Sequence, residues 1–574
     1  MKENSAEFWR QSAEQMQQTL AGNWAQALQA LQHLVPVPLQ SAAPPEAHSM
    51  PVVKFSPAKL QQLQQQYMQE AGELWAQAMT GKTVMHDKRF TAQAWSNNPM
   101  AAFSAANYLL NSRALMGLAD AVDADEKTRA RVRFAVEQWM AASAPSNFLA
   151  FNAEAQQKAI DSKGESIAKG LENLLHDLRQ GHVSMTDESQ FEVGKNVATT
   201  EGAVVFENEL FQLIEYKPLT AKVFEKPLLL VPPCINKFYI LDLQPENSLI
   251  RYAVEQGHRT FVVSWCNPDM ALAEKTWDDY IEDAAIKAIK VVREISGAKT
   301  INTLGFCVGG TILTTALAVL AQRGEKPASS ATLLTTLLDF SDTGILDIFI
   351  DHASVQYRES QMGKGGLMKG SDLASTFSFL RPNDLVWNYV VGNYLKGETP
   401  PPFDLLYWNS DSTNLPGPFY AWYLRNTYLE NRLVKPGKAT VCGEKIDLRK
   451  VDLPVYVYGS REDHIVPIGG AYASTQYLPG KKRFVMGASG HIAGVINAPA
   501  KNKRSHWTAS TDTFAPTAED WIAAATEKPG SWWPDWAAWL KGHAGKQIAA
   551  PKSFGRGKYK VIEKAPGRYV KAKA

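Results

Sequence analysis

The chain has 574 residues, of which 45% are apolar, and its formal net charge at pH 7 is +2. This length exceeds what one compact core accommodates, so about two or three structural units are expected. The small net charge and the lack of a run of lysine and arginine argue against a nucleic-acid-binding protein.

The first ~190 residues are predicted to form a mainly helical domain, which we place at residues 1–190. Residues 1–34 are rich in Gln, Ala and Leu, which is typical of an amphipathic helix, and several prolines between 36 and 51 then indicate a linker. That first helix can be read either as a docking helix or as an ordinary packed helix. Further helical patterns follow at residues 57–80, 99–122, 126–142 and 164–180.

From about residue 199 the sequence changes to short strands. We expect strands at residues 203–206, 210–216, 227–231 and 259–265, followed by a helix over about 276–295. The run at 227–231 is apolar throughout, as in a strand that is buried on both faces. Strands that alternate with helices predict an α/β fold with a parallel sheet, and we place this catalytic domain at residues 191–574.

Residues 302–310, with the sequence NTLGFCVGG, have the form of a nucleophile elbow with cysteine at the nucleophile position. In a Gly-x-nucleophile-x-Gly turn the small residues let a strand and the following helix pass close together, and Gly305 and Gly309 take these places around Cys307. The helix N-terminus would favour a thiolate, and the amide of Val308 would point at a developing oxyanion. The alternative is a buried structural cysteine beside packing glycines.

A second oxyanion donor is expected in the loop that follows the strand at 227–231. In α/β-hydrolases this loop provides the other amide of the oxyanion hole. In this chain the loop is residues 232–237, PPCINK, and we place the donor near Cys234 or Ile235, with Ile235 as the choice.

A cysteine nucleophile needs a base and an acid, and in this fold they follow in the order nucleophile, acid, histidine. The histidines after the elbow are His352, His464, His491, His506 and His543. His491 follows a predicted strand at 482–486, and Asp463 follows one at 453–458, so we assign His491 as the base and Asp463 as the acid. Asp339 also follows an apolar strand and remains an alternative acid.

Residues from about 341 to 450 interrupt the rhythm of strands and helices, and we interpret them as an inserted cap domain. Their many aromatic residues indicate either a core of the cap itself or a substrate tunnel. A cap that excludes water favours acyl transfer over hydrolysis. Exchange of one thioester for another is nearly thermoneutral, and attack by a hydroxyl then gives an oxygen ester.

With these features the chain resembles the class I polyhydroxyalkanoate synthases, closely so from about Asp87 onward. The resemblance is carried by the segments 232–243 (PPCINKFYILDL), 305–310 (GFCVGG), 381–387 (RPNDLVW), 458–465 (YGSREDHI) and 487–494 (GASGHIAG). It implies an α/β-hydrolase fold and the polymerisation of (R)-3-hydroxyacyl-CoA, chiefly 3-hydroxybutyryl-CoA, with release of CoA. The growing polyester would be held as a covalent cysteinyl thioester.

The resemblance also implies roles for single residues. Cys307 would carry the acyl chain and His491 would activate the cysteine. Asp463 would help to activate the attacking 3-hydroxyl, either directly or through the histidine. Arg381 would meet the CoA phosphates, with a local salt bridge as the alternative. His464 adjoins the acid, and we assign it to the support of that loop and to substrate binding.

For the whole protein the resemblance implies a homodimer formed largely through the cap, and association with polyester storage granules and their coat proteins, the phasins. No cofactor is implied, because CoA is part of the substrate and a product. The N-terminus has no apolar segment of the signal-peptide kind, and no run of about 18 apolar residues occurs, so we expect a cytoplasmic protein without a transmembrane segment. The cysteines lack metal-ligand spacing, and no metal is expected.

Two rival functions remain at the level of sequence. A cysteine hydrolase of the dienelactone-hydrolase kind shares the elbow and the triad order, but it is a small single domain without a cap. A catalytically silent scaffold on granules is the other rival, and the complete set of cysteine, aspartate and histidine counts against it.

Overall fold

The computed structural model describes residues 54–80, 83, 85–509 and 514–574. The helix predicted at residues 1–34 and most of the linker after it lie outside the described residues. The chain divides into two compact units. We call residues up to 186 together with 377–401 the helical unit, and residues 187–376 together with 402–574 the sheet unit.

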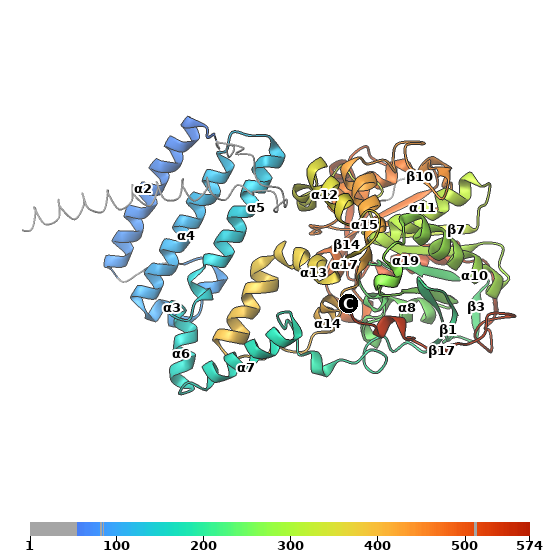
Figure 1. The fold of residues 1–574 in the computed structure, drawn as a ribbon, viewed down its shortest axis with the longest axis horizontal. Coiled ribbons are helices and arrows are strands. Elements are labelled where there is room, and N and C mark those ends of the chain that lie inside the picture. The colour runs from blue at the N-terminus through green and yellow to red at the C-terminus, as the bar shows by residue number, and fades with distance from the viewer. Residues whose placement is uncertain (1–53, 81–82, 84, 510–513) are drawn as a thin grey trace, which may run out of the picture. The chain divides into compact units, whose positions relative to one another are not determined.

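The helical unit contains the four helices predicted for residues 57–180. Asn98 and Asp125 cap the starts of two of them. The Asn98 side chain accepts from two amides of the first turn, and the Asp125 side chain accepts from the amide of Thr128. Three long helices, α2, α4 and α5, lie side by side (Figure 1). The α-helices of this unit before residue 186 are α2 (Pro57–Met79), α3 (Gln93–Asn97), α4 (Pro99–Asp120), α5 (Glu126–Ser143), α6 (Ala153–Asp161) and α7 (Glu165–Gln180).

Residues 377–401, which fall within the predicted insertion, pack with these N-terminal helices. They contain the π-helices η9 (Asn383–Trp387) and η10 (Val390–Leu395). The hydroxyl of Tyr394 donates to Asp177 Oδ2 on α7 at 2.6 Å. At Gly170 of α7 an added Cβ would lie 2.0 Å from the carbonyl oxygen of Tyr394, so the close approach of η10 requires glycine there. This part of the insertion therefore belongs to the helical unit.

The sheet unit is built on a mixed sheet in the order β15-β14-β13-β12-β7-β6-β4-β5-β2-β1-β17. The strands from β13 to β5 in this order run parallel, and those outside them are antiparallel. The strands are β1 (Gly202–Glu207), β2 (Phe211–Tyr216), β4 (Leu228–Val231), β5 (Thr260–Trp265), β6 (Ile301–Phe306), β7 (Ala328–Leu334), β12 (Val455–Ser460), β13 (Lys482–Gly487), β14 (Ser505–Thr508), β15 (Thr526–Pro529) and β17 (Glu563–Lys564).

Helices cover both faces of this sheet, so the central strands are buried on both sides. In β4, Leu229 and Val231 belong to one apolar core and Leu228 and Leu230 to the other. This confirms the two-sided burial predicted from the apolar run. The larger covering helices are α8 (Leu249–Glu255), α10 (Lys287–Ser296), α11 (Val308–Gln322) and α19 (Trp533–Lys541), and a π-helix, η7 (Tyr280–Ile286), joins α9 (Trp277–Asp279) to α10.

The rest of the insertion packs within the sheet unit. Its helices are α12 (His352–Met362), α14 (Asp404–Ser410), α15 (Gly417–Tyr423) and the π-helix η11 (Leu424–Leu429). Within α13 (Gly370–Phe379), the chain passes from the sheet unit to the helical unit after Thr376. The ring of Trp277 on α9 stacks on Phe419 and Tyr423, with centroids 5.1 and 5.5 Å away. The insertion's aromatics thus extend the core of the sheet unit.

Candidate active site

Cys307 stands on the tight turn between β6 and α11. Its backbone angles, φ 53° and ψ −129°, lie in a region that residues other than glycine rarely adopt. The turn is held from both sides, because the Cys307 amide donates to the Leu334 carbonyl at 2.9 Å and the Gly310 amide donates to the Cys307 carbonyl at 2.9 Å. Such a strained backbone conformation persists only where the surrounding structure holds it. The turn places the Cys307 thiol, which is half-buried, at the carboxyl end of β6.

The glycines of the elbow are required by the close approach of the backbone. A Cβ on Gly305 would lie 2.3 Å from Gly310 Cα, and one on Gly309 would lie 2.2 Å from the Val231 carbonyl oxygen. Both distances are to backbone atoms, which cannot rotate out of the way. The packing role predicted for these glycines is therefore present in the structure.

Replacement of Gly309 by alanine is expected to destabilise the protein by about 3 kcal/mol, because the added methyl group overpacks the contact between α11 and the end of β4. Urea unfolding followed by circular dichroism measures this change. The control is Gly72→Ala on α2, where an added Cβ meets nothing within 4 Å. Equal stability of Gly309→Ala and the wild type would contradict the close approach.

His491 and Asp463 meet at the carboxyl ends of β13 and β12. His491 Nδ1 lies 2.7 Å from Asp463 Oδ2. The other carboxylate oxygen of Asp463 accepts hydrogen bonds from the amides of Ile465 at 2.8 Å and Val466 at 2.9 Å. Both side chains are buried, and the ring of Phe306 stacks on the imidazole with centroids 5.8 Å apart. The carboxylate is thus fixed in a position that orients the ring.

The surroundings of His491 favour its protonated form. Burial alone lowers the pKa of the imidazole, but the charge of Asp463 and that of a Cys307 thiolate, with hydrogen bonds to both, raise this pKa from 6.5 to about 10. The contact with Cys307 brings all three predicted residues together. Such an arrangement suits an imidazolium beside a thiolate, the reactive form of a cysteine nucleophile.

The raised pKa of His491 predicts a dependence of stability on pH. Because the folded state holds this proton more tightly than the unfolded state, the stabilisation is complete below pH 6.5 and is lost as the pH rises through about 10. In the Cys307→Ala background, where no thiolate forms, the unfolding free energy relative to Cys307→Ala/His491→Gln is expected to fall as the pH rises above 6.5. Denaturant titrations at several pH values measure the difference, and a difference that does not change with pH would contradict it.

The two candidate oxyanion donors lie on segments that touch each other. Val308 is the first residue of α11, so its amide has no partner within the helix. Ile235 lies in the loop after β4, whose start contacts the elbow, since a Cβ on Gly309 would be 2.5 Å from the Pro232 carbonyl oxygen. Cys234 is buried, and burial, with the charge of the nearby Cys307, raises the pKa of its thiol. Cys234 therefore stays protonated beside the nucleophile.

Asp339, the alternative acid, is engaged elsewhere. Its Oδ1 accepts from Asn431 Nδ2 at 2.7 Å, and its Oδ2 accepts from the hydroxyl of Tyr477 at 2.9 Å. These contacts tie the end of β7 to two other segments of the sheet unit. The structure pairs His491 with Asp463 instead.

The remaining predicted site residues are His464 and Arg381. His464 is half-buried directly after Asp463. Arg381 lies in the helical unit, where its guanidinium pairs with Asp384 Oδ2 at 2.8 Å. Asp384 also forms a salt bridge with Lys88, whose Nζ lies 2.9 Å from Asp384 Oδ1. The local salt bridge considered for Arg381 from the sequence is thus present.

Two tyrosines of the insertion that the sequence did not single out as site residues lie near the nucleophile. Burial raises the pKa of Tyr428, and the charge of Cys307 is the next largest cause. The pKa of Tyr423 is raised by burial, by Tyr428 and by Cys307. Only the tertiary fold reveals this, because both residues are about 120 positions from the elbow and share no motif with it.

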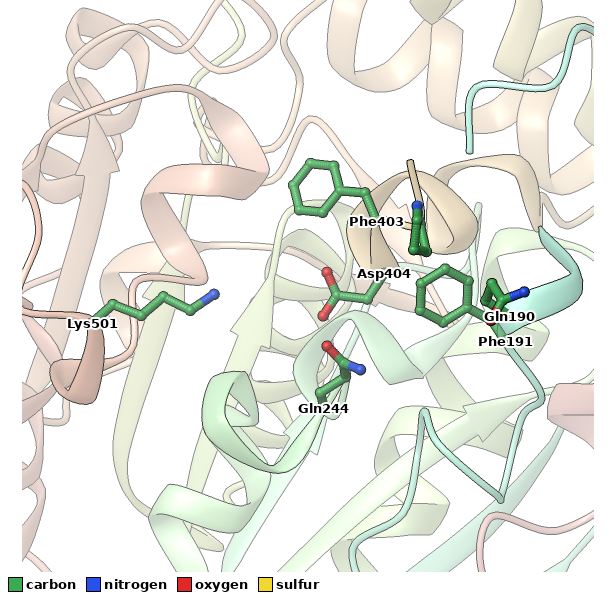
Figure 2. A pocket seen from close by; sticks show the side chains of 7 residues that line it. Gln190, Phe191, Gln244, Phe403, Asp404 and Lys501 are labelled. Atoms are coloured by element: carbon green, nitrogen blue, oxygen red, sulfur yellow. The ribbon is translucent and has the colours of Figure 1, made fainter. Parts of the chain in front are cut away.

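A cavity of about 360 Å³ opens elsewhere on the sheet unit (Figure 2). Asp404 points into it between Phe403 and Gln244, with Lys501 facing from the other side (Figure 2). The carboxylate is already partnered, because Asn247 Nδ2 donates to Asp404 Oδ2 at 2.7 Å. None of the three triad residues lines this cavity.

Two properties bear on cofactors and membranes. Within residues 54–80, 83, 85–509 and 514–574, no group of three or more His, Cys, Asp or Glu side chains is arranged to hold a metal ion. In the same part of the chain, no helix combines the length and the apolar character needed to cross a membrane.

Comparison with known proteins gives consistent matches over most of the chain. The sequence profile described as the N-terminus of poly-beta-hydroxybutyrate polymerase (PhaC) matches residues 86–253, and the profile of the alpha/beta hydrolase fold matches residues 227–498. The chain is 63% identical over 531 residues to the poly(3-hydroxyalkanoate) polymerase subunit PhaC of Cupriavidus necator, covering 91% of this chain and 90% of that protein. It is 40% identical to the same subunit of Rhizobium meliloti, covering 88% and 84%, and 40% identical to the poly(3-hydroxyalkanoate) polymerase of Methylorubrum extorquens, covering 90% and 88%.

Proposed function

The chain belongs to the poly(3-hydroxyalkanoate) polymerase family, and we propose that it polymerises short-chain (R)-3-hydroxyacyl-CoA, chiefly 3-hydroxybutyryl-CoA, through a thioester on Cys307. Membership makes it an acyltransferase with an α/β-hydrolase fold. The observation that supports the thioester is the approach of His491 to both Cys307 and Asp463 at the end of the parallel sheet.

In the first half-reaction, the Cys307 thiolate attacks the thioester carbonyl of the substrate. The amides of Val308 and Ile235 stabilise the negative charge on the carbonyl oxygen. The intermediate collapses with cleavage of the bond to CoA, and the His491 imidazolium donates its proton to the departing thiolate. The acyl group is then bound to Cys307, and His491 is neutral.

In the second half-reaction, the 3-hydroxyl of another (R)-3-hydroxyacyl-CoA molecule attacks the acyl group on Cys307. Neutral His491, oriented by Asp463, takes the hydroxyl proton while the new oxygen ester forms and the Cys307 thiolate leaves. The imidazolium and thiolate are restored, and the elongated chain, now a CoA thioester, acylates Cys307 in the next first half-reaction. Each cycle lengthens the polyester by one unit and releases one CoA.

We assign Arg381 and His464 to substrate binding. Arg381 is about half exposed and would exchange its contact with Asp384 for a CoA phosphate, to which a guanidinium binds well. His464 would support the Asp463 loop at the rim of the site. An unchanged KM for the CoA thioester in Arg381→Ala would contradict the assignment of Arg381.

For the assembled protein we propose a homodimer in the cytoplasm, bound to polyester storage granules and in contact with granule-coat proteins of the phasin class. Family membership supports this proposal. Analytical ultracentrifugation without substrate tests the dimer, and a monomer across micromolar concentrations would exclude it.

The function is tested by incubating the purified protein with (R)-3-hydroxybutyryl-CoA while free CoA is measured and the product is analysed for polyester and free acid. We expect polyester with stoichiometric CoA. Free 3-hydroxybutyrate would show the hydrolase that the sequence left as a rival, and no CoA release would show the silent scaffold.

A further inference from the structure

The loop that contains Ile235 is held in place by a segment of the insertion, residues 411–413. Asn236 and Ser412 form an antiparallel β-bridge. Next to it, the Thr413 amide donates to the Ile235 carbonyl at 3.3 Å. The position of Ile235, and with it the direction of its amide, therefore depends on where residues 411–413 lie.

Asp411 begins this segment and is a buried carboxylate, with 2% of its surface exposed. Its Oδ2 accepts from the hydroxyl of Tyr239 at 2.9 Å, and its Oδ1 lies 3.1 Å from Lys573 Nζ. Tyr239 follows the oxyanion loop directly, in the short helix η4 (Phe238–Leu241). Asp411 thus joins the far side of the loop to the last residues of the chain.

Lys237, the last residue of the loop, is also 2% exposed. Its Nζ donates to the Ala572 carbonyl at 2.5 Å, and its own carbonyl accepts from Trp408 Nε1 at 2.8 Å. Burial lowers the pKa of Lys237, whereas the charge of Asp411 raises it. Asp411 is therefore the nearby carboxylate that compensates a cation two residues from the candidate oxyanion donor.

The tail at Ala572 and Lys573 completes the cluster. Besides its contact with Asp411, Lys573 is fixed by its backbone, because Asn267 Nδ2 donates to the Lys573 carbonyl at 2.6 Å. Asn267 follows β5, the strand beside β4 in the sheet. Tail, insertion and oxyanion loop are thus connected through one buried carboxylate.

We propose that Asp411, Lys237 and Lys573 form a positioning cluster that holds the Ile235 amide in place to stabilise the oxyanion. This inference rests on the proposed function, since it gives the cluster a part in that reaction. The three side chains do not touch the reacting atoms. Their effect is exerted through the backbone of the loop.

The physical argument is that an oxyanion donor works only if it is fixed before the reaction. If Asp411 loses its charge, the buried Lys237 is left without compensation, and the loop must move to hydrate it. A misplacement of about 1 Å at a reacting centre can cost about 100-fold in rate. The loss should appear in kcat and not in KM, because the oxyanion develops only in the transition state.

The test compares Asp411→Asn, Lys573→Met and Lys573→Arg with the wild type. Initial rates of CoA release are divided by the number of competent sites, counted as Cys307 peptide labelled by iodoacetamide in mass spectrometry. The matched control is Lys571→Met, which removes an exposed lysine two residues from Lys573. Only the fast phase of labelling is counted, because Cys307 in unfolded protein lacks the neighbouring imidazolium and reacts at the slower rate of an ordinary thiol.

We expect the per-site kcat of Asp411→Asn to fall between about 10- and 100-fold with KM within about twofold, and that of Lys573→Met to fall less. Lys573→Arg is expected to restore the rate, and Lys571→Met to leave it unchanged. Unaltered per-site kcat in both Asp411→Asn and Lys573→Met, with polyester made by the wild type, would overturn the cluster and leave the proposed function standing. Absence of CoA release by the wild type would overturn both.

Discussion

Cys307→Ala is expected to lower the rate of CoA release from (R)-3-hydroxybutyryl-CoA by about 10⁴-fold or more and to make no polyester, because the acyl group then has no nucleophile to bind. The neighbouring Cys234 cannot replace it, since burial raises the pKa of that thiol and keeps it protonated. Release of CoA is followed with a thiol reagent, and the acyl-enzyme is sought by mass spectrometry after acid quenching.

Two further variants sharpen this result. Cys307→Ser keeps the shape of the elbow but offers a hydroxyl, which is far less ionised than a thiol, so most of the activity should be lost. Cys442→Ala is the matched control, because Cys442 lies between β10 (Thr440–Val441) and β11 (Glu444–Lys445) and takes no part in the triad. Undiminished CoA release by Cys307→Ala would mean that another group is the nucleophile.

The elbow could be predicted from sequence because its information is local. Gly305, Cys307 and Gly309 lie within five positions, and their spacing specifies a strand, a strained turn and a helix. One rule then predicts the acid and the base, since parallel strands end at a common edge of the sheet. Cys307, Asp463 and His491 follow β6, β12 and β13, as the expected strands required.

The sequence favours Asp463 as the acid but leaves Asp339 as an alternative. Both follow apolar strands, and their different partners come from distant positions. Asp339 is bound by Asn431 and Tyr477, 92 and 138 residues away. Hydrogen bonds at such separations depend on the assembled fold.

The same limit applies to the insertion and to the oxyanion loop. Nothing in the pattern of residues 377–401 shows that they pack on α7, because that contact depends on a glycine more than 200 positions earlier, Gly170. Lys237 and Ala572 are 335 positions apart. A lysine in a loop is ordinarily exposed, so nothing in the sequence predicts that Lys237 is buried or that a carboxylate lies near it.

Asp463→Asn is expected to reduce kcat by about 10³- to 10⁴-fold with the fold retained, because the amide keeps the shape of the carboxylate but neither its charge nor its two acceptor oxygens. The geometry at stake is the 2.7 Å contact with His491 Nδ1, together with the amides of Ile465 and Val466 that fix the carboxylate. An amide in this place can present its NH₂ group to Nδ1 and so favour the wrong tautomer of the imidazole.

The variant should also change the response to pH, which a purely structural role would not do. The charge of Asp463 is the largest of the causes that raise the pKa of His491 to about 10, so removing that charge should move this pKa down toward 6.5. The alkylation rate of Cys307 by iodoacetamide, measured from pH 5 to 10, follows the imidazolium that stabilises the thiolate. Asp339→Asn is the control and should keep the wild-type pH profile of alkylation. Loss of activity in Asp339→Asn, with activity retained in Asp463→Asn, would show that Asp339, after β7, is the acid.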